Sequence, residues 1–253
     1  MIKEKIFFPI IFLFIPLAGI CKDSKEHILS ILNERYAKSS EKVSNLVITE
    51  RIEYPGNKLI PYSDLTIYKK KQKIRLEIET NSQEKSKNIF IFDGNEYYQI
   101  YAGFTKKVSL ENLEKVESKH VDFENSWIKE IISEGTNFSQ VKEGNVSYYL
   151  FSGKKNNRFY ELWMDKKFYI PYKIICYDTE HASDKLKIII TRHTNLMDCL
   201  YIPLEILIHT NNILAAKTKV IKINTDFEIP ESYFKVDNNQ KVEIKTILKN
   251  LFE

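Results

Sequence analysis

Short segments in which apolar and polar residues alternate run through most of the chain, and they constrain the fold more than any other feature. Successive side chains of a β-strand point to opposite faces of a sheet, so this alternation predicts strands. Turn residues such as Asp93-Gly94-Asn95 separate neighbouring segments, which is typical of antiparallel hairpins. The pattern predicts about eleven strands, at 46–54, 65–67, 74–78, 89–92, 98–100, 146–151, 158–164, 171–177, 185–191, 200–209 and 216–223.

Helical periodicity is confined to three places. An apolar stripe follows Asp23, a mainly helical stretch covers 109–133, and a short final helix is expected over 244–252. Many strands with two or three helices exclude a doubly wound α/β fold. We expect a mainly β fold with a few helices (α+β), in which one curved antiparallel sheet has its concave side covered by the helices.

The first residues have the layout of a secretory signal peptide. A cationic start over 1–5 precedes an apolar run from Ile6 to Leu17 and the small residues Ala18 and Gly19. The run is shorter than the roughly 20 residues of a membrane-spanning helix. We expect residues 1–21 to be a leader, residues 22–253 to form a single domain, and the mature protein to work in the periplasm.

Two cleavage points fit the leader. The segment Leu17-Ala18-Gly19-Ile20-Cys21 resembles the lipobox of bacterial lipoproteins, but Ile20 occupies a place where a small residue is usual. Cleavage after Cys21, with Gly19 and Cys21 as the small pair, fits as well. Acylation of Cys21 would anchor the protein to a membrane facing the periplasm, whereas removal of Cys21 would leave it diffusible.

Composition and cysteine content narrow the class further. A chain with 43% hydrophobic residues, seven Gly and seven Pro is globular, and its formal charge of +4 gives no indication of nucleic-acid binding. In an oxidising envelope, Cys176 and Cys199 could form a disulfide, or both could remain as buried thiols. Their spacing leaves both alternatives open.

The chain contains no recognisable catalytic motif. It lacks HExxH, G-x-S-x-G, Walker and G-x-G-x-x-G sequences, and its five histidines show no metal-ligand spacing. Arg192-His193 and Asp198 could form a polar site, but residues of these types usually lie on solvated strand faces. We therefore expect no enzyme, no metal and no cofactor.

Three strand motifs resemble a known family. Lys71 to Glu77, Ile91-Phe92-Asp93-Gly94 and Tyr97 to Tyr101 follow one another at the intervals of P-G-x-F-R-W-E, S-D-G-K and L-W-x-Y. These motifs belong to the outer-membrane lipoprotein carriers, the LolA-like family. Later segments at 161–165, 170–173, 202–205 and 223–224 are similar to the late strands of its lipoprotein-sorting branch.

The resemblance implies an unclosed β-barrel, capped by helices, that shelters lipoprotein acyl chains or another lipid and delivers them toward the outer membrane. Each methylene kept from water is worth roughly 0.8 kcal/mol, so an acyl chain needs an apolar compartment to cross an aqueous gap. It also implies partner proteins of envelope transport, and membrane contact that is transient or through a lipid anchor. Two alternatives remain: a non-transporting envelope sensor or scaffold on the same fold, and an enzyme with an unrecognised site.

The expected cavity lining consists of apolar strand residues together with residues of the predicted helical lid. Each of them would also be apolar in a solid β core, so the pattern does not distinguish a cavity wall from a packed core. The lining residues are Leu46, Ile48, Ile52, Leu65, Ile67, Ile74, Leu76, Ile78, Tyr98, Ile100, Trp127, Ile128, Ile131 and Trp163.

Overall fold

The computed structural model describes residues 24–82, 86–108, 128, 131–132, 137–155, 158–178 and 185–236. The expected leader with Cys21, the predicted lid residue Trp127 and the expected final helix lie outside these residues. Among the described residues, no helix has the length and apolarity needed to cross a membrane.

Helix α1 (Lys25–Lys42) opens the described chain. Ser24 caps it, because its side chain accepts a hydrogen bond from the backbone N–H of His27 at 3.1 Å. The N-cap residue is therefore Ser24, one position after Asp23, from which the apolar stripe was expected to follow. Ile28 and Leu32, one turn apart, are buried, so α1 packs through its predicted apolar stripe.

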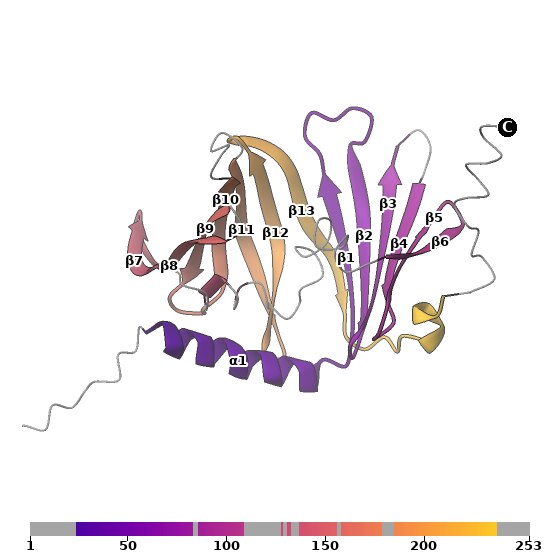
Figure 1. Cartoon of the computed structure of the whole chain (residues 1–253), viewed down its shortest axis with the longest axis horizontal. Coiled ribbons are helices and arrows are strands. Elements are labelled where there is room, and N and C mark those ends of the chain that lie inside the picture. Colours follow the sequence, from indigo (N-terminus) through magenta and orange to yellow (C-terminus); the bar gives the residue numbers. More distant parts are fainter. Residues whose placement is uncertain are drawn as a thin grey trace, which may run out of the picture.

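Thirteen strands follow in two groups, joined into one antiparallel sheet (Figure 1). The first group is β1 (Asn45–Glu53), β2 (Tyr62–Lys70), β3 (Lys73–Asn81), β4 (Ser86–Phe92), β5 (Tyr97–Tyr101) and β6 (Phe104–Val108). The second is β7 (Asn137–Glu143), β8 (Val146–Lys155), β9 (Arg158–Asp165), β10 (Pro171–Asp178), β11 (Lys185–Leu196), β12 (Leu200–Thr210) and β13 (Ile213–Asn224). A short 3-10 helix, η1 (Glu231–Phe234), is the last element among the described residues.

The strand order is β6-β5-β4-β3-β2-β1-β13-β12-β11-β10-β9-β8-β7. Pairing of β1 with β13 joins the two groups, while β6 and β7 are the two edges of the sheet and do not pair with each other. The sheet is therefore an unclosed barrel, and the predicted mainly β fold with a curved antiparallel sheet is confirmed.

Strand register separates the two faces of the sheet, because directly paired residues and residues two apart on a strand share a face. Residues related in this way lie on one face from β1 to β8: Ile52, Thr218, Ile206, Ile190, Ile188, Ile174, Leu162 and Phe151. Helix α1 packs on this face, since Ile28 and Leu32 form a core cluster with Leu162 and Phe151. We call it the inner face and the opposite one the outer face.

The far end of the β11–β12 hairpin leaves the sheet. Within the described strands, β12 pairs with β13 only from Glu205 onward, and β10 pairs with β11 only between Tyr177 and Lys173, the latter opposite Ile189. Residues 193–203, which we call the arm, pair only with each other. The arm packs on the inner face of β1–β3, because Cys199 and its neighbours share a core cluster with residues of these strands.

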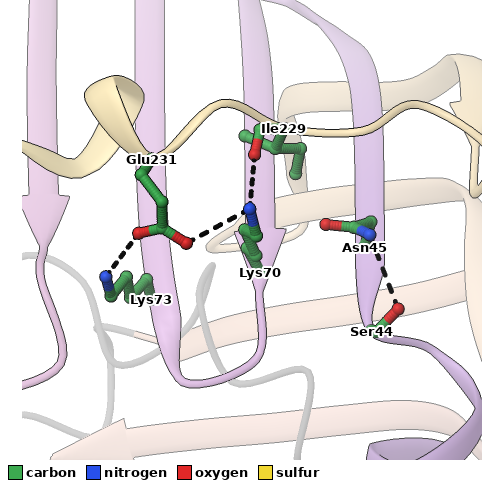
Figure 2. A network of polar contacts seen from close by, with 6 residues as sticks. All are labelled: Ser44, Asn45, Lys70, Lys73, Ile229 and Glu231. Carbon is green, nitrogen blue, oxygen red and sulfur yellow. Dashed lines mark hydrogen bonds and ion pairs between the residues drawn. The ribbon is translucent and has the colours of Figure 1, made fainter.

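A segment of the chain after β13, residues 226–236, crosses the outer face of β1–β5, and we call it the strap. Figure 2 shows how it is held: Lys70 Nζ donates to the carbonyl of Ile229 at 2.8 Å, and Glu231 forms ion pairs with Lys70 and Lys73 at 3.1 and 2.6 Å. The strap residues Ile229 and Phe234 are buried against the outer face, beside Ile91. Both faces of this half of the sheet therefore carry apolar residues.

Candidate functional site

The inner face holds two clusters of buried apolar residues, and a different element covers each of them. Under α1 lies the helix cluster, which consists of Ile28, Leu32, Ile128, Ile132, Tyr149, Phe151, Leu162, Met164 and Ile174. Under the arm lies the arm cluster, which consists of Val43, Leu46, Ile48, Leu65, Ile67, Leu76, Cys199, Leu200 and Ile202.

The structure brings together all eight lining residues predicted on β1–β3. Five of them, Leu46, Ile48, Leu65, Ile67 and Leu76, belong to the arm cluster and are at most 4% exposed. The other three, Ile52, Ile74 and Ile78, are half-buried and pack against it. The arm, which the sequence did not indicate as a cover, fills the space in front of these residues.

The helical residues Ile128 and Ile131 lie elsewhere on the inner face. Ile128 is 1% exposed in the helix cluster, and Ile131 packs against that cluster. These two residues therefore do not lie opposite the predicted lining residues of β1–β3, because in the described residues it is the arm that packs against β1–β3.

Tyr98 and Ile100 lie on the outer face, so their predicted place in the lining is wrong. Tyr98 pairs with Ile91, and both pack beneath the strap. The inward-pointing neighbour of Ile91 is Phe90, which packs against the arm cluster. The strap makes the outer face of β4 and β5 apolar, and alternation alone gave no means of telling which apolar set points inward.

Trp163 also lies on the outer face, because its neighbours Leu162 and Met164 belong to the helix cluster. The ammonium of Lys173 lies 3.6 Å from the Trp163 ring centroid and donates to Glu143 at 2.8 Å. Trp163 thus takes part in a cation–π pair on the outside of the sheet and does not line the inner face.

The suggested disulfide is absent, since Cys176 and Cys199 are both free thiols. Cys176 is half-buried near the end of β10, whereas Cys199 is 1% exposed in the arm cluster. The alternative of a buried thiol that packs as a small hydrophobic residue describes Cys199.

Polar residues also lie on the inner face, and three of them, Ser63, Thr218 and Glu50, were missed from the sequence. Ser63 and Thr218 are 2% and 5% exposed, and both are cross-strand partners of Ile52. Glu50 lies between Leu65 and Val220, its partners on β2 and β13. Burial raises the pKa of the Glu50 carboxyl to about 7. The signal was present in the sequence, because Glu50 takes an inward position between Ile48 and Ile52.

Arg35 of α1 contacts both the arm and the turn between β9 and β10. Its guanidinium donates to the carbonyls of Tyr169 at 3.0 Å and Phe168 at 2.7 Å, in the turn between β9 and β10. The same group lies 4.6 Å from the ring centroid of Tyr201 in the arm. One side chain of α1 therefore contacts both the β9–β10 turn and the arm.

The polar residues singled out in the sequence do not assemble a reaction centre in the structure. His193 is half-buried and pairs with Pro203, whereas Asp198 is exposed and accepts a hydrogen bond from Asn195 at 3.4 Å. The described residues contain no group of three or more His, Cys, Asp or Glu side chains that could hold a metal ion. The arrangement of the inner face suits apolar contact.

No protein-family model and no curated protein matches the sequence. Solved structures do match. A DUF1329 family protein from Desulfovibrio piger is 11% identical, with a TM-score of 0.53 over 84% of this chain and 98% of the other. A domain described as an outer membrane lipoprotein-sorting protein domain, from Vibrio parahaemolyticus, is 13% identical, with a TM-score of 0.53 over 89% and 100%.

A third match is a LolA superfamily protein from Nitrosomonas europaea, 11% identical, with a TM-score of 0.51 over 81% of this chain and 97% of the other. All three similarities extend over most of both chains. Identities this low show the fold alone. The chain has the LolA-like fold.

Proposed function

We propose that this protein is a carrier that shelters acyl chains, of lipoproteins or of another lipid, on its inner face and delivers them toward the outer membrane. One observation carries the proposal: an apolar face extends from β1 to β8, and it is covered by α1 and by the arm, which both pack on this face. In this proposal the protein is no enzyme and uses no cofactor.

The contacts of the two covers suggest how binding and release can both occur. In the structure, Ile28 and Leu32 of α1 and Leu200 and Ile202 of the arm occupy the inner face. An acyl chain can replace these apolar contacts with its own, at roughly 0.8 kcal/mol for each buried methylene. Because one set of contacts is exchanged for another, the bound and unbound packings stay close in free energy, and the lipid can be released.

The fold and the sequence both support the carrier proposal. The Vibrio parahaemolyticus domain with this fold is described as a lipoprotein-sorting domain, and the strand motifs resemble those of lipoprotein carriers. The leader over 1–21 suggests the periplasm as the place of action. Acylation of Cys21 would instead make the protein a membrane-tethered acceptor of lipid, with the same inner face.

A second candidate is a non-transporting envelope sensor or scaffold. The burial of Leu46, Ile48 and Ile67, each at most 2% exposed, favours it, because these residues would serve equally as a closed core. Such a protein would bind a partner through its surface and would hold no lipid.

The test is to purify the protein in its folded state from the cell envelope, extract it with organic solvent and analyse the extract by mass spectrometry. A carrier yields acyl chains in a fixed ratio to protein, and the ratio falls when the protein is unfolded before extraction. A partner protein recovered without any lipid would support the sensor or scaffold instead. Mass spectrometry of the mature amino terminus decides between removal and acylation of Cys21.

A further inference from the structure

Four exposed, large apolar side chains lie in or beside the turns at one end of the sheet, which we call the distal end. The turns join β1 to β2 (54–61), β5 to β6 (102–103) and β12 to β13 (211–212). The side chains are Leu59 and Ile213, each 73% exposed, Tyr101 at 54% and Phe104 at 46%. Among the described residues, no other large apolar side chain is as exposed as Leu59 and Ile213.

Strand register places the three turns at the same end of the sheet. β1 ends where β13 begins, because Glu53 pairs with Lys217. The strands from β1 to β5 are antiparallel neighbours in succession, so β1, β3 and β5 all end on this side, and Tyr101 lies beside the beginning of β4. Figure 1 shows the β1–β2 turn and the start of β13 at the end of the sheet away from α1.

The β1–β2 turn satisfies its own backbone groups around Leu59. The side-chain oxygen of Asn57 accepts hydrogen bonds from the backbone N–H of Leu59 at 3.1 Å and of Ile60 at 3.0 Å. The backbone N–H of Tyr54 donates to the carbonyl of Pro61 at 2.9 Å. Contact of this turn with an apolar medium therefore leaves none of these N–H groups without an acceptor.

The other two turns are as short as a hairpin allows. Both residues of the turns 102–103 and 211–212 have positive φ, between 49° and 81°, as two-residue hairpins of type I′ require. Tyr101 and Phe104 therefore pair directly at the tip of their hairpin, and Ile213 comes immediately after its turn. The apolar side chains are thus close to the tips of the hairpins.

The charge at the distal end is positive where it is most exposed. None of the three turns contains an Asp or Glu residue, and Lys58 in the β1–β2 turn is exposed. Lys154 near the end of β8 and Arg158 at the start of β9 are exposed at the same end, because β8 to β12 continue the antiparallel order.

The described acids at this end are covered or paired. Glu53 and Asp178, at the ends of β1 and β10, are half-buried. Glu79 is exposed near the end of β3 and forms an ion pair with Lys87 at 3.0 Å. These acids therefore do not cancel the positive charge that the exposed cations present.

The opposite end differs, because acids accompany its exposed apolar residues. Three such residues have an exposed acid beside them in sequence or in register, and none is more than 46% exposed: Val146, Met197 and Phe227. The acids are Glu143, Asp198, Asp226 and Glu228. The ring of a fourth residue, Phe168, lies 6.4 Å from that of Tyr201. A negatively charged surface would repel this end and attract the distal end.

Apolar side chains on projecting turns, with exposed cations and without acids in the turns, match the interface of a membrane that contains anionic lipid. We propose that the distal end docks on an anionic phospholipid bilayer, with Leu59 and Ile213 among the acyl chains and Lys58 beside the phosphates. Tyr101 suits the headgroup level, where tyrosine is enriched. This inference goes beyond the proposed function, because docking on a membrane does not require a lipid on the inner face.

Cosedimentation with vesicles tests the proposal. The protein is the full chain with Cys21→Ser, which removes the possible acylation site, and the vesicles are phosphatidylcholine alone or equimolar phosphatidylcholine and phosphatidylglycerol. We expect binding to the mixed vesicles that weakens with salt, and weaker binding to phosphatidylcholine. Leu59→Asp and Ile213→Asp should each weaken binding to the mixed vesicles about tenfold, because an inserted side chain is lost and a negative charge is added.

The matched control is Met197→Asp, which places the same charge at an exposed apolar position of the opposite end and should leave binding unchanged. Lys58→Glu adds a second test that changes no apolar contact, and it should weaken binding to the mixed vesicles only. All four positions are exposed, so the variants should keep the thermal unfolding midpoint of the unsubstituted protein.

Several results would overturn the proposal. They are equal binding to both kinds of vesicle, binding to neither, and a loss with Met197→Asp as large as with Leu59→Asp. A partner protein that Leu59→Asp no longer binds, without any binding of vesicles, would assign the distal end to protein contact. The carrier function is tested separately, since Leu59→Asp and Ile213→Asp should yield the same amount of extracted lipid as the unsubstituted protein.

Discussion

Replacing Glu50 by glutamine should change how stability depends on pH. Burial raises the pKa of this carboxyl from 4.5 to about 7 in the folded protein. At pH 4 the group is protonated in both the folded and the unfolded chain, so it has no net effect. Between pH 4.5 and 7 the unfolded chain releases the proton and the folded chain keeps it, which stabilises the unfolded state and lowers the free energy of unfolding.

The size of the effect follows from that difference. At about 1.4 kcal/mol for each pKa unit, the native carboxylate lowers the free energy of unfolding by up to about 3 kcal/mol above pH 7. Glutamine has nearly the same shape and does not ionise. The stability of Glu50→Gln relative to the unsubstituted protein should therefore rise from its value at pH 4 by up to about 3 kcal/mol at pH 8.

Urea denaturation of both proteins at several pH values between 4 and 8 measures this gain directly. Glu53→Gln serves as the control, since it removes the same formal charge from the outer face of the same strand. A difference between Glu50→Gln and the unsubstituted protein that is constant from pH 4 to pH 8 would refute the reasoning, because it would mean that the Glu50 carboxyl is solvated in the folded state.

Three further outcomes are expected. Ile78→Ala removes three carbons from the inner face, worth up to roughly 2 kcal/mol of apolar contact, and should weaken binding of a fluorescent fatty acid about tenfold. The control, Ile89→Ala, changes a half-buried residue on the outer face of the next strand and should leave binding unchanged. Equal effects of the two substitutions would place the ligand elsewhere. Arg35→Met loses two hydrogen bonds to the β9–β10 turn and should speed probe exchange in stopped-flow measurements roughly tenfold, while unchanged exchange would show that α1 does not control access. Iodoacetamide should label Cys176 in the folded protein and Cys199 only after unfolding, as peptide mapping can check; rapid labelling of Cys199 would contradict the packing of the arm.

The sequence predicted the strands where one face is buried and failed at the edges of the sheet. Strands β6 and β7 were missed because few apolar residues mark them: Phe104 and Val108 in one, Phe138 and Val141 in the other. Both are edge strands, each with a neighbour on one side only. A strand at an edge is less covered, so its alternation is weak.

Face assignment within the candidate site was predictable only in part. Alternation grouped Leu46, Ile48 and Ile52 correctly, because their strand has a continuous apolar set on one side. It could not exclude Tyr98 and Ile100, since the strap packs on the outer face of β4 and β5, where the residues are apolar as well. The strap and the arm are contacts between segments far apart in the chain, and a local pattern carries no information about them.

The arm itself shows what local patterns omit. A strand was predicted over 200–209, and the observed β12 spans Leu200–Thr210, yet its first residues leave the sheet and cover β1–β3. The arm begins where β12 stops pairing with β13, while β13 goes on pairing with β1, so its position involves strands that are far apart in the chain. The pairing of β1 with β13 also places Thr218 beside Ile52 on the inner face.

The central claim is that acyl chains bind to the inner face, and photo-cross-linking tests it most directly. The intact protein is loaded with a fatty acid that carries a diazirine near its methyl end, irradiated, digested and mapped by mass spectrometry. The arm, residues 193–203, contacts the inner face, and the strap, residues 226–236, contacts the outer face, so the two report on opposite sides of the same strands. We predict adducts in the arm and on Leu46 to Ile52, with none in the strap. Adducts confined to the strap, or no adducts at a saturating concentration of the probe, would contradict the claim.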